Sequence, residues 1–295
     1  MQLDNLLTRV PMNKIDMKRP PQLLDFTILG AGGLIGSNLL SHLTENGCKV
    51  STPTKVTSGV LKARHGHIIY CIGLTSDFRR RPLDTMQAHV CILRDLLEHT
   101  EFESLTYLSS TRVYHGASTT MENSALCVNP VNLEDLYAIS KIAGESLCHQ
   151  AGRENIKVLR LSNIVGFRKD SDLFIDELLN EIVTRKSLTL KSSLLSNKDY
   201  LCIDDAVKAI VAFAESKEAG CFNVASGINI SNQMIIDQLM LNFHFELTTL
   251  EAAPVIEFMP INVEKIKKTF QFEPTQFSDY FPQFINFYKK SKGIK

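Results

Sequence analysis

The stretch LGAGGLIGSNLL, from Leu29 to Leu40, decides the fold that we predict for this chain. Its glycines Gly30, Gly33 and Gly36 recur every third residue, between an apolar run and a segment with apolar residues at helical spacing. In a strand–turn–helix unit the first glycine permits a tight turn, the second lets the backbone approach a pyrophosphate, and the third lets helix and strand pack closely. The helix N-terminus adds unpaired N–H donors. We therefore interpret the stretch as a dinucleotide-binding loop, with a glycine-rich structural turn as the alternative.

Strand and helix patterns alternate on both sides of this loop. Apolar runs predict strands at residues 23–30, 48–52, 67–73, 104–110 and 156–166, and helical spacing predicts helices at 34–47, 82–100 and 136–151. Strands that are apolar along their length and alternate with helices indicate a parallel sheet covered on both faces. We predict an α/β fold, a Rossmann-type doubly wound parallel sheet with a smaller C-terminal substrate-binding lobe.

The pattern divides the chain into three parts. Residues 1–22 lack clear periodicity, end in Pro20-Pro21 and are expected to form an N-terminal extension. Residues 23–166 form the expected dinucleotide-binding core. Residues 167–295 form the expected substrate-binding lobe, which is interleaved with the end of the core.

Composition narrows the class of protein. The 295 residues are 44% apolar and 22% charged, with a formal net charge of zero, so no charge excess points to a nucleic acid or a membrane surface. The seven cysteines are scattered without C-x-x-C pairs, and the eight histidines lack metal-ligand spacing, so we expect reduced thiols and no metal. We find no signal peptide and no apolar run of about 20 residues. These features favour a soluble, cytoplasmic enzyme.

The pair Tyr137 and Lys141 is the first catalytic candidate. Four residues apart on a helix, the two side chains share one face. A tyrosine with a pKa of about 10 is a poor base at neutral pH. A neighbouring ammonium lowers that pKa, so we expect Lys141 to favour the phenolate. An isolated Y-x-x-x-K is more often a half-buried aromatic beside a solvated lysine.

The segment YLSSTRVYHG, from Tyr107 to Gly116, adds hydroxyl groups to this pair. It follows a predicted strand, and ligands bind at the carboxyl ends of the strands in parallel α/β sheets. A serine there can hydrogen-bond a substrate oxygen while the tyrosine moves a proton.

Together these residues resemble the extended short-chain dehydrogenase/reductases, the NAD-dependent epimerase/dehydratase family acting on nucleotide sugars. The matching elements, in family order between about residues 24 and 275, are GAGGLIG, SSTRVY, YAISK, RLSNIVG, KDYLCIDD and FNVASG. The resemblance implies that Tyr137 is the general acid/base and that Lys141 tunes it and binds the cofactor ribose. Ser110, with Ser109 as the fallback, matches the catalytic hydroxyl. Asn163 and Lys198 match substrate-binding positions near the phosphates.

The expected cofactor is NAD or NADP, with NAD slightly preferred. The expected cofactor-binding residues belong to the glycine loop, the ends of the second and third strands, and the catalytic pair: Gly30, Gly33, Leu34, Ile35, Gly36, Thr52, Cys71, Ile72, Gly73, Tyr137 and Lys141. The segment CKVSTPTK lacks the family's ribose-binding carboxylate, which removes the usual argument for NAD over NADP. The span to the third strand is also short, where the family usually fits another helix and strand.

Two further features bear on the substrate. Thr111-Arg112 stands where sugar 4,6-dehydratases carry Asp-Glu, so we disfavour a dehydratase. The usual phosphate-binding arginine before EFMPINVEKIKK is missing, and Arg79 and Arg80, with Arg81, could replace it because guanidinium groups suit oxyanions. A solvated charge run is the alternative.

We predict an NAD(P)-dependent epimerase or ketoreductase that transfers hydride at a secondary alcohol or ketone of a nucleotide sugar, in carbohydrate biosynthesis. A non-catalytic NAD(P)-binding sensor or scaffold of the same fold is the alternative. The expected partner is a small-molecule substrate, with no nucleic acid and no membrane, and a homodimer is the oligomeric state to be tested.

Overall fold

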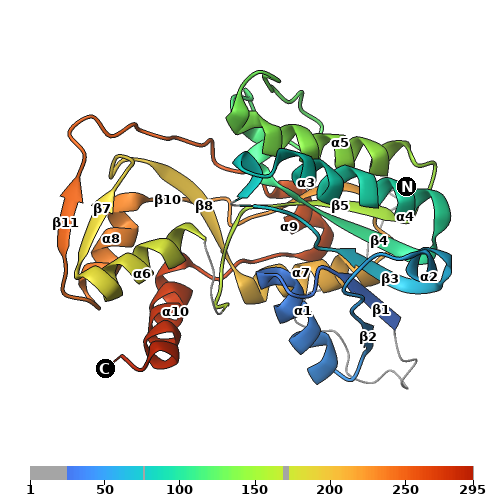
Figure 1. Cartoon of the computed structure of the whole chain (residues 1–295), viewed down its shortest axis with the longest axis horizontal. Helices are drawn as coiled ribbons and strands as arrows, with labels where there is room; N and C mark the ends of the chain where they lie inside the picture. The colour runs from blue at the N-terminus through green and yellow to red at the C-terminus, as the bar shows by residue number, and fades with distance from the viewer. Residues whose placement is uncertain (1–24, 76, 169–172, 295) are drawn as a thin grey trace, which may run out of the picture.

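The computed structural model describes residues 25–75, 77–168 and 173–294. The expected N-terminal extension lies outside these residues. Figure 1 shows two lobes joined side by side, a larger one that holds the first strands and a smaller one that holds the C-terminal helix.

A six-stranded parallel sheet forms the larger lobe. Its order is β2-β1-β3-β4-β5-β9, and its bounds are β1 Asp25–Leu29, β2 Lys49–Ser51, β3 Arg64–Tyr70, β4 Glu101–Ser110, β5 Ile156–Leu161 and β9 Gly220–Val224. All five strand pairs are parallel, so the carboxyl ends of the strands lie along one edge. The predicted Rossmann-type α/β fold is confirmed.

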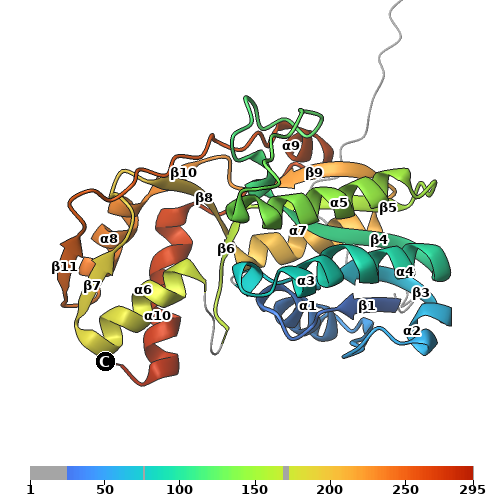
Figure 2. The same cartoon turned by 45° about the horizontal axis from the view of Figure 1, so that its top comes forward.

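Helices cover both faces of this sheet (Figures 1 and 2). One face carries α3 Pro82–Met86, α4 Ile92–His99 and α5 Leu136–Gln150, and the other carries α1 Leu34–Glu45 and α7 Ile203–Glu215. Strand β3 contributes buried side chains to both faces. Ile68 and Tyr70 join the core beneath α4 and α5, whereas Ile69 joins the core beneath α1 and α7. The alternation of side chains along a strand produces this division.

The predicted helix at 82–100 is interrupted by a π-helical turn. This turn, η2, runs from Gln87 to Cys91 between α3 and α4. Single π-turns inside α-helices occur frequently at functional sites. The 3-10 turns are η1 Asp77–Arg79, η3 Thr111–Tyr114 and η4 Leu133–Asp135.

The sheet is short on the side of β2. Between β2 and β3 the described chain forms one short helix, α2 Ser58–Lys62, and no strand. Strand β2 has three residues and is the edge of the sheet. The helix and strand that the family usually fits there are therefore absent from the described residues.

The smaller lobe holds two small sheets and three helices. The sheets have the orders β10-β8-β6 and β11-β7. The bounds are β6 Asn163–Val165, α6 Phe174–Arg185, β7 Ser187–Leu190, β8 Asn197–Cys202, β10 Asn229–Ser231, α8 Asn232–Met240, β11 Glu246–Thr249 and α10 Phe277–Lys292, while α9 Glu264–Phe270 packs on β9 of the larger sheet. We retain the domain boundary at residue 166 as a proposal.

The single strand predicted at residues 156–166 was wrong in one respect, because the structure divides it. Strand β5 pairs with β4 and β9, and β6 pairs with β8 in the other lobe. Ser162, between them, still donates its N–H to the Val224 carbonyl at 3.1 Å. The sequence does not mark this division, because apolar residues occur on both sides of Ser162, in β5 and in β6.

We expect Gly144→Ala to lower the free energy of unfolding by about 1–3 kcal/mol, the usual cost of forcing extra atoms into a packed core. A Cβ there would lie 2.6 Å from Cζ of Tyr107 and 2.9 Å from the His89 carbonyl oxygen. Urea unfolding followed by circular dichroism measures the change. The matched control is Gly59→Ala in α2, where the nearest atom would be 3.7 Å away. Equal stability of both variants would contradict this close packing of α5 on β4 and η2.

Candidate active site

A cavity of about 420 Å³ opens at the carboxyl ends of the larger sheet, against β6 and α6 of the other lobe. Eleven of the residues predicted for the site line it: Gly33, Leu34, Ile35, Gly36, Cys71, Ile72, Gly73, Ser110, Tyr137, Lys141 and Asn163. The structure thus brings the glycine loop and the predicted catalytic residues to one space. Five other predicted residues are not among those that line it: Gly30, Thr52, Arg79, Arg80 and Lys198.

The three glycines of the loop differ in their surroundings: Gly30 and Gly36 are closely packed, whereas Gly33 borders open space. Gly30 has a φ of 93°, and a Cβ there would lie 2.8 Å from the Cys71 carbonyl carbon, where β1 and β3 end together. At Gly36 a Cβ would lie 2.8 Å from the Ala31 Cα, so the start of α1 packs directly on the loop. At Gly33 the nearest atom is 3.6 Å away. The space beside Gly33 is therefore open to a ligand.

The start of α1 has the properties of an anion site. Gly33 is its N-cap and provides no side-chain acceptor, and no acidic residue lies in the first turn. The first N–H groups of a helix lack intrahelical partners and carry partial positive charge. Arg168, which also lines the cavity, donates from Nη1 to the Gly32 carbonyl at 3.4 Å, while its buried Nε has no partner among the described residues. These donors fit the pyrophosphate of a dinucleotide, and the sequence reasoning had missed Arg168.

Tyr137 lies almost fully buried in the cavity wall, 7% exposed. Burial raises the pKa of its phenol, while hydrogen bonding with Ser110, the charge of Arg112 and hydrogen bonding with Thr75 each lower it. The expected lowering by Lys141 is not among these effects. Ser110 therefore lies where the sequence placed it, and Thr75, which also lines the cavity, is a contact that the sequence reasoning missed.

Lys141 lies one turn further along α5 and is 5% exposed. Its ammonium donates to the Leu108 carbonyl at 2.9 Å and lies 5.9 Å from the ring centre of Tyr137. Burial lowers the pKa of Lys141 to about 8, although Glu145 and Cys71 raise it. The backbone contact explains why its effect on the phenol is small, because it holds the ammonium against β4.

His89 is a further site residue that sequence reasoning missed. It is fully buried in η2, and its ring lies edge-on to that of Tyr137, 5.4 Å between centres. Ser140 donates to the Tyr137 carbonyl at 2.8 Å, so we assign the proton of His89 to Nδ1, which donates to Ser140 Oγ at 2.7 Å. Nε2 then accepts from the Leu74 N–H at 3.3 Å. His89 thus connects α5, the helix that carries Tyr137 and Lys141, to the loop after β3.

Only spatial proximity reveals this role. His89 precedes Tyr137 by 48 positions, and its pairing with Ser140 depends on how η2 packs against α5. The one signal in the sequence was a histidine inside an otherwise apolar helix face. Burial, followed by the charge of Lys141, lowers the pKa of His89 to about 2 and keeps the ring neutral.

The arginine run lies at the rim of the site, and part of it is already paired. Arg79 forms an ion pair with Glu134, and Arg81, which lines the cavity, bonds Asp84 at 2.8 Å. Arg112 also bonds Glu134, at 3.1 Å. Arg80 is exposed at the end of η1.

Asn163 and Lys198 occupy neighbouring strands of the smaller lobe. Asn163 donates from its side chain to the Asp199 carbonyl at 2.8 Å. The Lys198 ammonium lies between the rings of Phe174 and Phe258, 5.3 and 5.9 Å from their centres. Burial, followed by the charge of Arg112, lowers the pKa of Lys198.

Comparison with known proteins places the chain in a family. Residues 60–225, more than half of the chain, match the NAD dependent epimerase/dehydratase family. The chain belongs to this family, and its fold and the enzyme class predicted from the sequence agree with it. A search of curated proteins finds no match.

Solved structures support the fold. MoeE5 in complex with UDP-glucuronic acid and NAD superposes with a TM-score of 0.77 at 19% identity, over 90% of this chain and 99% of that one. The UDP-glucuronic acid 4-epimerase from Bacillus cereus, in complex with UDP-glucuronic acid and NAD, gives 0.75 at 19%, with the same coverage. RMD from Pseudomonas aeruginosa, complexed with NADPH, gives 0.74 at 20%, again over 90% and 99%.

Two other properties come from the described residues. None of their helices has both the length and the apolar character needed to cross a membrane. They also contain no group of three His, Cys, Asp or Glu side chains arranged to hold a metal ion.

We expect His89→Asn to change how stability depends on pH. Below pH 6.5 the unfolded chain binds a proton at His89 that the folded chain does not, so acid destabilises the wild type by up to about 1.4 kcal/mol per pH unit at this site. The variant lacks this site. At pH 8 it should be about 1–3 kcal/mol less stable, because Leu74 and Ser140 lose a partner. The difference should shrink between pH 6.5 and 4.5.

Urea unfolding at each pH measures this difference. The matched control is His244→Asn, at an exposed position, which should follow the wild-type curve. Parallel curves for His89→Asn and the wild type would show that His89 is not held neutral by burial.

Proposed function

We propose that this chain is an NAD(P)-dependent epimerase or ketoreductase that acts on a secondary alcohol or ketone of a nucleotide sugar. The observation that carries the proposal is the convergence of Ser110, Tyr137, Lys141 and the open side of Gly33 on one cavity. Family membership supports it. So do the neighbouring structures reported above, which contain NAD or NADPH and, in two of the three, a nucleotide sugar.

The cofactor would bind across the carboxyl ends of β1, β3 and β4. Gly33, the first N–H groups of α1 and Arg168 would hold its pyrophosphate, and Lys141 would bind the ribose beside the reacting ring. Cys71, Ile72 and Gly73 line the same wall. When bound, the nicotinamide supplies or accepts the hydride.

The adenine end would lie toward β2, beyond Thr52. No carboxylate follows β2 to repel a 2′-phosphate, and Lys55 is exposed nearby. We keep NAD as the preferred cofactor, because two of the neighbouring structures reported above contain it, and NADP as the alternative.

Tyr137 would exchange the proton at the reacting oxygen. Because burial raises the pKa of its phenol, the residue is protonated at neutral pH and suits the acid role when a ketone is reduced. In the reverse direction the charge of Arg112 and the hydrogen bonds with Ser110 and Thr75 favour the phenolate that accepts the proton. Ser110 would donate a hydrogen bond to the same oxygen and hold it beside the phenol.

The substrate would extend from this point toward the smaller lobe. Asn163 lines the cavity, and Lys198 follows on the neighbouring strand β8. Both suit the diphosphate of a nucleotide sugar. Arg80 remains a candidate for the same anionic part, whereas Arg79 would have to leave Glu134 to reach it.

We expect Tyr137→Phe to lower turnover about 100-fold or more, as lost general acid–base catalysis does, because the ring remains and the exchangeable proton is gone. The assay for a reductase is loss of NAD(P)H absorbance with a 4-keto nucleotide sugar, and the assay for an epimerase, which consumes no cofactor, is interconversion of the two sugar epimers. Urea unfolding is the control and should show a folded variant. Turnover close to that of the wild type would remove Tyr137 from the mechanism. Cofactor binding by the wild type without turnover on any such sugar would favour the sensor alternative.

We expect Gly33→Val to fold normally and to lower the affinity for NADH or NADPH at least tenfold. A Cβ at this position would meet no protein atom closer than 3.6 Å, and the valine side chain would enter the space assigned to the pyrophosphate. Titration calorimetry measures the affinity. Gly32→Val, at the adjacent position where a Cβ would meet nothing within 4 Å, is the matched control. If both variants bind like the wild type, the loop is a structural turn only.

A further inference from the structure

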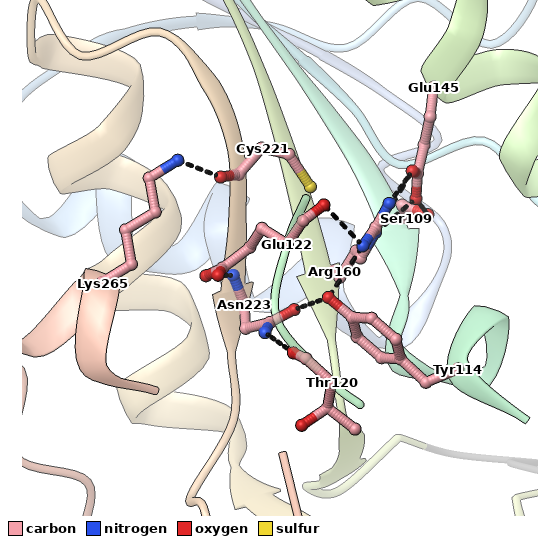
Figure 3. A network of polar contacts seen from close by, with 9 residues as sticks. All are labelled: Ser109, Tyr114, Thr120, Glu122, Glu145, Arg160, Cys221, Asn223 and Lys265. Carbon is pink, nitrogen blue, oxygen red and sulfur yellow. Dashed lines mark hydrogen bonds and ion pairs between the residues drawn. The ribbon is translucent and has the colours of Figure 1, made fainter. Parts of the chain in front are cut away.

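A buried ion pair lies behind the cavity wall, between β5 and α5 (Figure 3). Arg160 and Glu145 have side chains that are 5% and 4% exposed. Nη2 of Arg160 lies 2.6 Å from Oε2 of Glu145, and Nε lies 3.0 and 3.1 Å from the two carboxylate oxygens. Removing two charges from water is costly, and apolar replacements of buried pairs are often as stable. Stability is therefore a weak reason for these charges.

Glu145 of this pair also contacts β4, the strand that carries Ser110. Ser109 donates its hydroxyl to Oε1 of Glu145, and both side chains are buried. Because Ser109 immediately precedes Ser110, the carboxylate fixes the end of strand β4, where Ser110 lines the cavity.

Arg160 of this pair contacts the segment that follows Ser110. Arg160 donates from Nη1 to Tyr114 Oη at 2.7 Å, and Tyr114 donates to Oδ1 of Asn223 at 2.8 Å. Arg160 also donates to the Glu122 carbonyl at 3.3 Å. Figure 3 shows the contacts of the guanidinium group with Tyr114 and Glu122, and the further contact from Tyr114 to Asn223. The chain is thus held on both sides of Ser110.

The charge of Glu145 also acts on Lys141 and raises the pKa of its ammonium group. Glu145 follows Lys141 by four positions on α5, so the two side chains share a face. The other titratable groups that act on Lys141 or contact it come from the packed elements around it: Cys71 after β3, His89 in η2, Tyr107 in β4 and Tyr137 in α5.

These four groups are uncharged at neutral pH. Burial raises the pKa of the Cys71 thiol to about 12 and raises the pKa of both phenols, and His89 is neutral. Among the described groups around Lys141, Glu145 is therefore the one negative charge. It opposes the burial that disfavours the ammonium.

We propose that Glu145, held by Arg160, is a positioning residue of the active site that fixes Ser110 through Ser109 and maintains Lys141 as an ammonium ion. The assignment of roles to Ser110 and Lys141 rests on the proposed function. The placement of the charge rests on the contacts alone.

The test is Glu145→Gln, which keeps the size and the acceptor for Ser109 but removes the charge. Lysine labelled with ¹³C at Cε lets each lysine titration be followed by NMR, and the signal missing from Lys141→Met assigns Lys141. We expect Lys141 to deprotonate at a lower pH in Glu145→Gln than in the wild type. The matched control is Glu122→Gln, whose carboxylate accepts from the Asn223 N–H at 3.0 Å in the same network. Its Lys141 titration should equal that of the wild type.

A second measurement links the charge to binding. If Lys141 bonds the cofactor as an ammonium, Glu145→Gln should weaken NADH binding about tenfold more at pH 8.5 than at pH 6.5, relative to the wild type, as expected for a lost charged hydrogen bond. A purely structural role would instead lower stability and leave the pH profile unchanged.

The outcomes separate this inference from the proposed function. An unchanged Lys141 titration in Glu145→Gln overturns the inference, and so does a neutral Lys141 at pH 7 in the wild type, which needs no variant to fold. A shifted titration in a protein that binds neither NADH nor NADPH supports the electrostatic assignment and rejects the proposed function instead.

Discussion

The parallel register of β3, β4 and β5 is the constraint on which the site depends. Tyr70 pairs with Tyr107, and Ser110 pairs with Leu161, so three strands that are far apart in the sequence end at one edge. Parallel strands require crossover connections, and here these are the helices that cover the sheet. One of them, α5, delivers Tyr137 and Lys141 to the edge where β4 delivers Ser110. The position of the cavity therefore depends first on how the strands pair, and the side chains that line it depend on that pairing.

Burial changes the protonation equilibria of the two titratable side chains at this edge, Tyr137 and Lys141. It raises the pKa of the Tyr137 phenol and lowers the pKa of the Lys141 ammonium, so both groups are pushed toward their neutral forms. The protein counters this with groups that are themselves buried or half-buried. Arg112 and Ser110 act on the phenol, and Glu145 acts on the ammonium. Each counter-charge needs a partner of its own, which explains a network as extended as that around Arg160.

The two ends of the expected cofactor site differ in how much protein surface surrounds them. Around Gly30, Gly33 and Gly36 the backbone leaves room where a pyrophosphate would lie and closes where helix and strand meet. On the adenine side the sheet ends at the three-residue strand β2. A short edge offers less surface to a nucleoside, so more of the binding would depend on the pyrophosphate donors, including Arg168.

The sequence by itself determined the order of strands and helices, the glycine loop and the candidate catalytic set Ser110, Tyr137 and Lys141, because these depend on local periodicity and on spacing within one helix or one turn. It could not reveal the split of the strand at 156–166, because both halves are equally apolar and only the sheets differ. It also could not reveal His89 or Arg168, because His89 contacts Ser140, 51 positions away, and Arg168 contacts Gly32, 136 positions away. Those contacts, and the charge that Glu145 places beside Lys141, were decided by how the helices pack on the sheet, since burial and distance between remote side chains exist only in the folded chain.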